Sequence, residues 1–336
     1  MDAFELFKDD LLLENNYSLN IVVIKRIDLV AKSIGPERTR NELLPYLADI
    51  IEQYDHDEAH YIIAEKLGSF IDLIGDSAHL VDILPLLEQL ASKEEVGIRT
   101  AVTDSLILIL PSLSKSILVN NIIPLLKRLA DDHWFTTRVT ATSLFTSIYK
   151  LVTETNSRQM LRNLYSDLCN DDTPMVRKSA IVNLSSFLAI VDTKHIINDL
   201  LSIIQDVSND DLELMRQEIL STYVTLCNVF DINDYTDHIL PLIQKAVNDK
   251  SWRIRRKLAI ILPNLLKNLK THHSDINNES DIIKISLLPM LGILLSDVEA
   301  EVRISACNSI SNICNILEYD SIIADTTLDV IESLVK

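Results

Sequence analysis

The segment NDDTPMVRKSAIVNLSSFL (Asn170–Leu188) decides the fold, because its acidic turn, arginine and apolar helix return along the chain. In each copy an aspartate is followed six residues later by an arginine: Asp132/Arg138, Asp171/Arg177, Asp210/Arg216, Asp249/Arg255 and Asp297/Arg303. The first four pairs are spaced by 39 residues, and the fifth comes 48 residues after the fourth. A period of about 40 residues is typical of stacked helical pairs. The sequence therefore predicts a repeat protein.

A second marker shares the period. Two aliphatic residues and a proline recur at residues 43–45, 83–85, 122–124, 239–241 and 287–289. Proline costs little in the first turn of a helix. We therefore assign each of these segments to the first helix of a repeat. That helix ends at the acidic turn, and the second helix follows, with apolar positions at three- and four-residue spacing.

Counting from these markers predicts an all-α solenoid, an α-α superhelix of about eight repeats plus one trailing helix, over residues 1–336. The repeats fall near 1–38, 39–76, 77–115, 116–154, 155–193, 194–232, 233–279 and 280–319. Residues 269–281 (LKTHHSDINNESD) are polar and predict a longer loop in the seventh repeat. Residues 320–336 predict the first helix of an incomplete ninth repeat. No polar capping repeat follows, so we expect further repeats to be missing at this end.

Composition excludes several functions. The net charge of −18 argues against a nucleic-acid partner, because neutralising phosphates requires clustered Lys and Arg. The five glycines form no phosphate-binding loop. The apolar runs are too short for membrane insertion, and the acidic N-terminus does not resemble a signal peptide. We expect a protein of the cytoplasm, with the nucleus as a second compartment.

No active site can be drawn from the spacing of nucleophiles and bases. His56 and His60 stand four apart among carboxylates, but HDEAH lacks the H-E-x-x-H order, so the expectation is a solvated turn without metal. The recurring acidic pairs suit helix capping better than catalysis. Cys307 and Cys314 lie seven residues apart on one helical face, which predicts buried thiols. We expect no catalytic residue, no cofactor and no enzyme activity.

The recurring charges predict a structural ladder. An aspartate ahead of a helix can cap its free amides, and the arginine can then reach an aspartate of the same or the adjacent turn. Arg99 extends the arginine series one period earlier, with Lys93 where its aspartate would stand. Such a network sets the register of stacking better than one pair does. The ladder residues are Asp132, Arg138, Asp171, Asp210, Arg216, Asp249, Arg255, Asp297 and Arg303.

Several turn sequences resemble one family, the scaffold (structural A) subunit of protein phosphatase 2A, which is built of HEAT repeats. The motifs are GPERTRNELLPYL (Gly35–Leu47), KRLADDHWFTTR (Lys127–Arg138), LCNDDTPMVRKSA (Leu168–Ala180), DKSWRIR (Asp249–Arg255) and SDVEAEVRISA (Ser296–Ala306). They occur in the order and at the spacing of that family, over essentially the whole chain. The resemblance implies an armadillo-like, non-catalytic scaffold that corresponds to the N-terminal portion of the family.

The resemblance also implies partners. The family docks regulatory B-type subunits on the turns of its N-terminal repeats and the catalytic subunit on the turns of its last repeats. Those last repeats have no counterpart here, so we expect the catalytic subunit to bind only if they are supplied. Lys178 stands where the family has an arginine, which puts a bidentate contact in doubt. The positions that match the docking turns are Trp134, Phe135, Pro174, Met175, Arg177, Lys178, Ser251, Trp252 and Arg253.

Three alternatives stay open. Each tryptophan either anchors a partner or packs over its turn against the neighbouring repeat. A transport or trafficking adaptor of the same architecture would instead take a basic peptide on an acidic face. A helical-repeat hydrolase or lyase is the third reading, although no catalytic constellation supports it.

Overall fold

The computed structural model describes residues 2–11, 20–272 and 283–317, which form helices joined by turns, with no strand among them. The chain divides into two compact units, Met1–Ala180 and Ile181–Lys336. The prediction of an all-α solenoid is confirmed. Within the described ranges, no helix is both long enough and apolar enough to cross a membrane.

The described residues of the first unit form thirteen α-helices, and a fourteenth, α14 (Pro174–Leu188), includes the unit boundary. The thirteen are α1 (Ala3–Leu11), α2 (Ile21–Ile24), α3 (Ile27–Ile34), α4 (Pro36–Arg38), α5 (Leu44–Gln53), α6 (Asp57–Leu67), α7 (Leu84–Ala91), α8 (Val96–Ile109), α9 (Lys115–Ile117), α10 (Ile123–Ala130), α11 (Phe135–Thr142), α12 (Phe145–Leu151) and α13 (Thr155–Cys169).

The described part of the second unit begins within α14 and continues through eight further α-helices. They are α15 (Thr193–Asp199), α16 (Leu201–Val207), α17 (Glu213–Leu226), α18 (Ile232–His238), α19 (Leu240–Ala246), α20 (Trp252–His272), α22 (Leu288–Leu295) and α23 (Ala300–Leu317).

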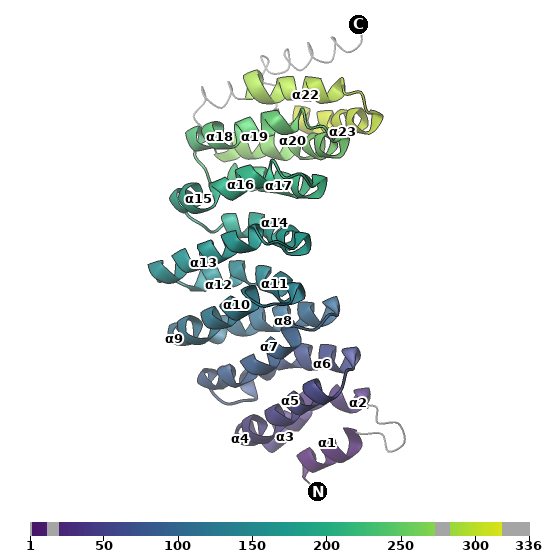
Figure 1. The fold of residues 1–336 in the computed structure, drawn as a ribbon, viewed down its shortest axis with the longest axis vertical. Coiled ribbons are helices and arrows are strands. Elements are labelled where there is room, and N and C mark those ends of the chain that lie inside the picture. Colours follow the sequence, from purple (N-terminus) through teal and green to yellow (C-terminus); the bar gives the residue numbers. More distant parts are fainter. Residues whose placement is uncertain (1, 12–19, 273–282, 318–336) are drawn as a thin grey trace. The chain divides into compact units, whose positions relative to one another are not determined.

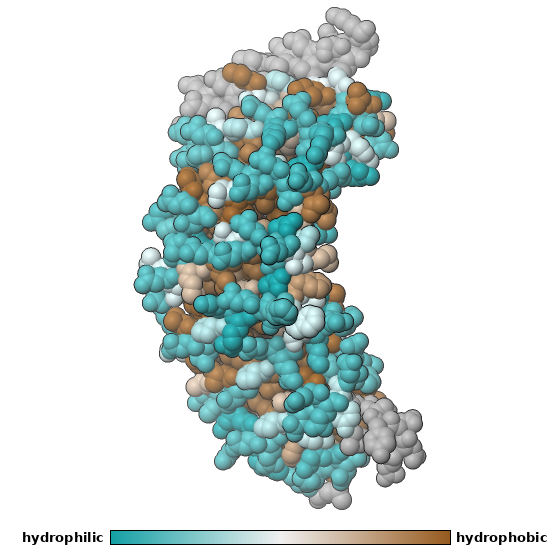
Figure 2. All heavy atoms as spheres, viewed as in Figure 1, coloured by the Kyte–Doolittle hydropathy of each residue, from teal (hydrophilic) through white to brown (hydrophobic). Residues whose placement is uncertain are grey.

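Within each unit the first helices of successive repeats stack on one another, and so do the second helices (Figure 1). In the first unit α5, α7, α10 and α13 form one layer, and α6, α8 and α11 form the other. In the second unit α17, α20 and α23 lie side by side, and α16, α19 and α22 pack against them. On the face seen in Figure 2, hydrophilic residues cover most of the helices, and hydrophobic residues show mainly in the seams between them. Each repeat therefore buries its apolar stripe against its neighbours.

The recurring prolines stand near the start of straight α-helical segments. In α5, α7, α10, α19 and α22 the proline is the second residue. A π-helical turn precedes three of these helices, at Thr39–Leu43, Leu118–Ile122 and Ile283–Leu287, and a 3₁₀ stretch, Ser77–Ile83, precedes α7. Proline lacks an N–H and its ring clashes with the carbonyl four residues earlier, so the preceding turn changes its pitch. The prolines thus lie inside the first helical arm of a repeat, close to the point where the helix type changes.

Two local predictions are wrong. The predicted loop at residues 269–281 begins too early, because α20 continues to His272. Cys307 and Cys314 are exposed, because α23 buries Ala306 and Ile313, one residue earlier on the helix. The rest of that loop and the trailing helix at 320–336 lie outside the described residues. The repeat boundaries stay predictions.

In the second-helix layer α6 and α8 approach each other closely at Gly68. A Cβ atom built on Gly68 would lie 2.6 Å from Ser105 Oγ and 2.9 Å from Ser105 Cα. The Ser105 hydroxyl also donates a hydrogen bond to the Ala64 carbonyl at 2.6 Å, which fixes the serine between α6 and α8. Because one of the opposing atoms belongs to the backbone, a side-chain rotation cannot make room.

We expect Gly68→Ala to lower the free energy of unfolding by about 1–2 kcal/mol, because overpacking outweighs the gain in helix propensity. Gly97→Ala in α8 is the matched control, since the nearest atoms to its new Cβ lie at 3.7 and 3.8 Å. The control is expected to leave stability unchanged or slightly raised. Urea titration of both variants tests this, and equal stability of the two would contradict it.

Candidate functional site

The acidic turns between the two helices of a repeat share one shape. In each, the aspartate carboxylate accepts a hydrogen bond from the backbone amide two residues later, an arrangement that stabilises a tight turn. The distances are 2.7 Å for Asp132 and Trp134, 2.8 Å for Asp171 and Thr173, 2.8 Å for Asp210 and Leu212, 2.8 Å for Asp249 and Ser251, and 2.9 Å for Asp297 and Glu299. The aspartate thereby holds the residues that follow it at the start of the second helix.

The arginine of each repeat closes the same turn from the other side. One terminal nitrogen donates to the carbonyl of the residue six positions earlier, at 2.8 Å in Arg99, 2.9 Å in Arg138, 2.8 Å in Arg177, 2.7 Å in Arg216, 2.7 Å in Arg255 and 2.6 Å in Arg303. In Arg99 the acceptor is the carbonyl of Lys93, so this contact does not depend on an aspartate.

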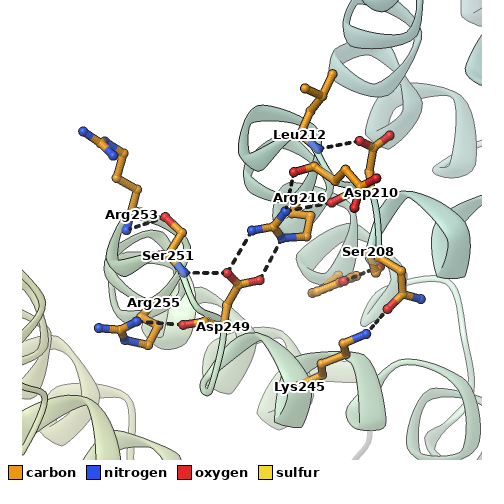
Figure 3. A network of polar contacts seen from close by, with 12 residues as sticks. Ser208, Asp210, Leu212, Arg216, Lys245, Asp249, Ser251, Arg253 and Arg255 are labelled. Carbon is orange, nitrogen blue, oxygen red and sulfur yellow. Dashed lines mark hydrogen bonds and ion pairs between the residues drawn. The ribbon is translucent and has the colours of Figure 1, made fainter.

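The rest of the guanidinium reaches the next turn. Arg138 binds the Asp171 carboxylate through Nε at 2.7 Å and through a terminal nitrogen at 3.0 Å. Arg216 binds Asp249 in the same way at 2.9 and 3.0 Å (Figure 3). Bidentate contacts of this kind are strong and directional.

A third pair has the same form, since Arg255 binds Asp297 at 2.5 and 2.9 Å. The sequence left open whether an arginine pairs in its own turn or the adjacent one. In these three cases the ion pair crosses to the adjacent turn, and the turn's own contribution is its carbonyl.

These pairs shift the pKa of the carboxyls. Burial alone raises the pKa of Asp171 and of Asp249, but hydrogen bonds from Arg138 and Arg216 and from backbone amides outweigh it and lower the pKa. For Asp297 the hydrogen bond from Arg255 is the largest cause of the lowered pKa. All three carboxylates are therefore held in the charged form.

One step of the ladder lacks its ion pair. No carboxylate of the described residues lies within ion-pair distance of Arg99, although Asp132 stands at the matching position of the next turn. Burial lowers the pKa of Arg99. Its side chain lines a hollow of about 350 Å³ between α8 and α11, together with Val139 and Thr140.

The turn between α10 and α11 presents two aromatic side chains to solvent. Trp134 is 63% exposed and Phe135 is 40% exposed. They line an open hollow of about 460 Å³ with Ser92 and Glu94 from the preceding turn. The His133 ring contacts the edge of Trp134 at a centroid distance of 6.1 Å. Trp134 therefore leaves most of its side chain open to solvent.

The next turn continues the exposed series. Pro174 and Met175 are exposed, Met175 by 61%, whereas Arg177 and Lys178 are half-buried. Arg177 binds the carbonyls of Asp171 and Asp172, so its guanidinium shapes the turn itself.

In the second unit the positions that match the docking turns of the resembled family form a compact group. Trp252 is half-buried, and the guanidinium of Arg253 lies over its ring at 4.7 Å. Ser251 accepts a hydrogen bond from the Arg253 amide at 3.2 Å (Figure 3), and Arg253 also lies 3.5 Å from Glu213. Cation–π stacking of this kind leaves the other face of the arginine free for further contacts.

Sequence reasoning missed two exposed leucines, one in the turn before α17 and one in the first turn of that helix. Leu212 and Leu214 are each 42% exposed. Their signal was positional, because Leu212 follows Asp210 by two residues, as Trp134 follows Asp132. Leu214 follows it by four, as Met175 follows Asp171.

The expected solvated histidine turn is wrong at one residue. Asp55 and Asp57 are exposed, but His60 has no exposed surface. His60 lies one 39-residue period before Arg99, so it occupies the register position of a ladder arginine.

A repeat-family profile and solved protein structures match this helical-repeat architecture. The HEAT repeat family profile matches residues 287–317. Residues 287–317 thus form a HEAT repeat of this α-solenoid. Solved structures share this fold at low identity. Cex1p has a TM-score of 0.54 at 18% identity, over 82% of this chain and 55% of that one. Kap95p, in a structure concerned with RanGDP, has a TM-score of 0.54 at 16% identity, over 98% of this chain and 43% of that one.

Curated relatives of this chain are scaffold and A-type regulatory subunits of protein phosphatase 2A. The A-type regulatory subunit of Saccharomyces cerevisiae is 38% identical over 112 residues, 33% of this chain and 18% of that protein. The scaffold subunit of Dictyostelium discoideum is 38% identical over 107 residues, 32% of this chain and 18% of that one. The beta isoform of the human 65 kDa A-type regulatory subunit is 43% identical over 99 residues, 29% of this chain and 16% of that one.

The predicted resemblance to the phosphatase scaffold subunits is therefore confirmed. The aligned segments span less than a fifth of each of these relatives. The relatives are named as scaffold or regulatory subunits, which agrees with a non-enzyme.

Proposed function

We propose that this chain is a non-catalytic scaffold of protein phosphatase 2A assemblies, and that its intra-repeat turns dock a regulatory B-type subunit. The observation that carries the proposal is the exposed pair Trp134 and Phe135 on a turn braced by Asp132 and Arg138. Large aromatic side chains dominate the binding energy of protein interfaces.

The bracing of the turn contributes to affinity. A partner that binds a flexible loop must order it, whereas these turns are already held by an aspartate and an arginine on either side. The partner therefore meets aromatic and thioether side chains on a backbone that is already held in place.

The neighbouring turn of the same unit extends the docking surface. Pro174 and Met175 add apolar area, and Lys178 adds a positive charge beside Arg177. Methionine adapts its shape to an apolar partner surface, and the lysine supplies a contact for acidic groups.

The second unit contributes a turn of different chemistry. Ser251, Trp252 and Arg253 combine a hydroxyl, a half-buried ring and a stacked guanidinium. Trp and Arg are enriched among interface hot spots. This group is suited to a partner that presents carboxylates and an apolar edge.

Binding of a purified regulatory B-type subunit tests the proposal. We expect the double variant Trp134→Ala/Met175→Ala to weaken binding about thirtyfold, which corresponds to the loss of about 2 kcal/mol from hot-spot side chains. Both side chains are exposed, so the fold should survive. Isothermal titration calorimetry gives the dissociation constants, and circular dichroism checks the fold.

Leu108→Ala is the matched control, because Leu108 is an exposed apolar residue of the same unit near the far end of α8. It should bind like the parent chain. Undiminished binding by the double variant would refute the docking site. Salt-sensitive binding of a Lys/Arg-rich peptide, with no binding of the regulatory subunit, would refute the scaffold function in favour of an adaptor.

A further inference from the structure

The His60 side chain on α6 is buried, and its two ring nitrogens lack hydrogen-bond partners. It has no exposed surface, and neither Nδ1 nor Nε2 makes a hydrogen bond of normal geometry. Buried polar side chains in folded proteins almost always have partners. An imidazole in this state calls for a ligand that the protein chain itself does not supply.

The ladder explains why no carboxylate of the next turn reaches His60. The position that elsewhere holds an aspartate is Lys93, whose ammonium donates to the Ile51 carbonyl at 3.4 Å. Burial and, next, the charge of Lys93 lower the pKa of His60. A neutral imidazole keeps a lone pair on one ring nitrogen that can bind a metal ion.

A backbone carbonyl lies beside the ring. The Tyr54 carbonyl, six residues before His60, raises its pKa and occupies the place of the carbonyl that each ladder arginine binds. A histidine that binds a metal typically directs its other N–H toward a carbonyl or carboxylate. His60 has this support available.

Two carboxylates complete a potential ligand set. The side-chain ligand atoms of Asp55, Asp57 and His60 all lie within 4.8 Å of one another. Tetrahedral zinc, with ligand bonds of about 2.0–2.2 Å, requires separations of about 3.3 Å. Asp55 and Asp57 are exposed, so rotation of their side chains can close the remaining gap.

We propose that His60, Asp55 and Asp57 bind a divalent transition-metal ion of the zinc type, with water at the remaining position. Imidazole with carboxylate oxygens suits Zn²⁺ among the common divalent ions. The ammonium of Lys93 opposes binding, so its removal should strengthen it. The site lies on the α5–α6 turn and does not depend on the proposed docking of a phosphatase subunit.

Zinc chloride titrated into the full chain, freed of metals with a chelator, tests the proposal by calorimetry. The parent chain is expected to bind one equivalent of Zn²⁺. The variant Asp55→Asn/Asp57→Asn is expected to bind Zn²⁺ at least tenfold more weakly. Both aspartates are exposed, so this variant remains decisive even if His60→Gln fails to fold. Lys93→Gln should bind zinc several-fold more tightly.

His56→Asn is the matched control. The His56 imidazole caps α6 by accepting from the Ala59 amide at 3.3 Å, and asparagine preserves such a cap. Zinc affinity should not change. Cobalt(II) should give a visible absorption band in the parent chain that the double aspartate variant lacks. Equal zinc affinity in the parent and the double aspartate variant, or no zinc binding by the parent, would overturn the proposal.

Discussion

Replacing Arg216 with methionine is expected to lower the free energy of unfolding by about 3 kcal/mol, because it leaves a partly buried carboxylate without its partner. The Arg216 side chain is 7% exposed and makes two hydrogen bonds to Asp249. It also donates to the carbonyls of Asp210 and Asp211, which would lose those bonds. Denaturant titration, with hydrogen exchange to locate the change, measures the effect.

Arg253→Met is the matched control for this loss. Arg253 forms an exposed ion pair with Glu213 at 3.5 Å, and such pairs contribute less than about 1 kcal/mol. The double variant Arg216→Met/Asp249→Asn should recover part of the loss, since no unpaired charge remains. Equal destabilisation by Arg216→Met and Arg253→Met would show that the ladder pair has no special role.

The second large effect is a loss of folding stability at acidic pH. The pKa values of Asp171, Asp249 and Asp297 are lowered in the folded chain. A carboxyl with a lowered folded-state pKa binds its proton more readily in the unfolded chain. Its stabilisation is therefore complete above the unfolded-state pKa of about 3.9 and is lost as the pH falls through the lower folded-state value.

The free energy of unfolding should accordingly be flat near pH 7 and fall steeply below about pH 4. The triple variant Asp171→Asn/Asp249→Asn/Asp297→Asn should be less stable at pH 7 and show a shallower fall. Thermal unfolding followed by circular dichroism at stepped pH values measures both slopes. Parallel slopes for the parent and the triple variant would contradict this origin of the acid sensitivity.

Much of the fold was predictable because the repeat signal is redundant. Each predicted repeat after the first carries a proline in its first helix, an acidic turn followed by an arginine, or both, so one marker assigns the helical arms where the other is missing. The finer shape was not predictable from periodicity alone. A proline constrains only its own turn, and whether the chain responds with a π turn or a 3₁₀ turn depends on how the arm packs.

The sequence predicted that arginines and aspartates pair at the turns, but it did not predict which aspartate each arginine binds. Charge and spacing place Arg216 equally well beside Asp210 or Asp249, and only the stacked helices decide between them. The exposure of Trp134 and the half-burial of Trp252 also depend on the neighbouring turn, which sequence spacing does not define.

The burial of His60 was not predictable from the sequence. Its acidic neighbours predicted a solvated turn, and its register only placed it one period before Arg99. The same register position is buried at Arg216 and exposed at Arg303, so burial depends on the side chains that the adjacent turns supply.

The span of the ladder bonds bears on how such chains change their length in evolution. Arg138 and Arg216 each bind an aspartate 33 residues further on, in the following turn. Deleting or duplicating one complete period leaves every such arginine facing an aspartate of the same geometry. Deleting half a period would leave a partly buried arginine or aspartate without its ion-pair partner at the junction. Repeat number can therefore drift in whole steps, while each junction keeps the same chemistry.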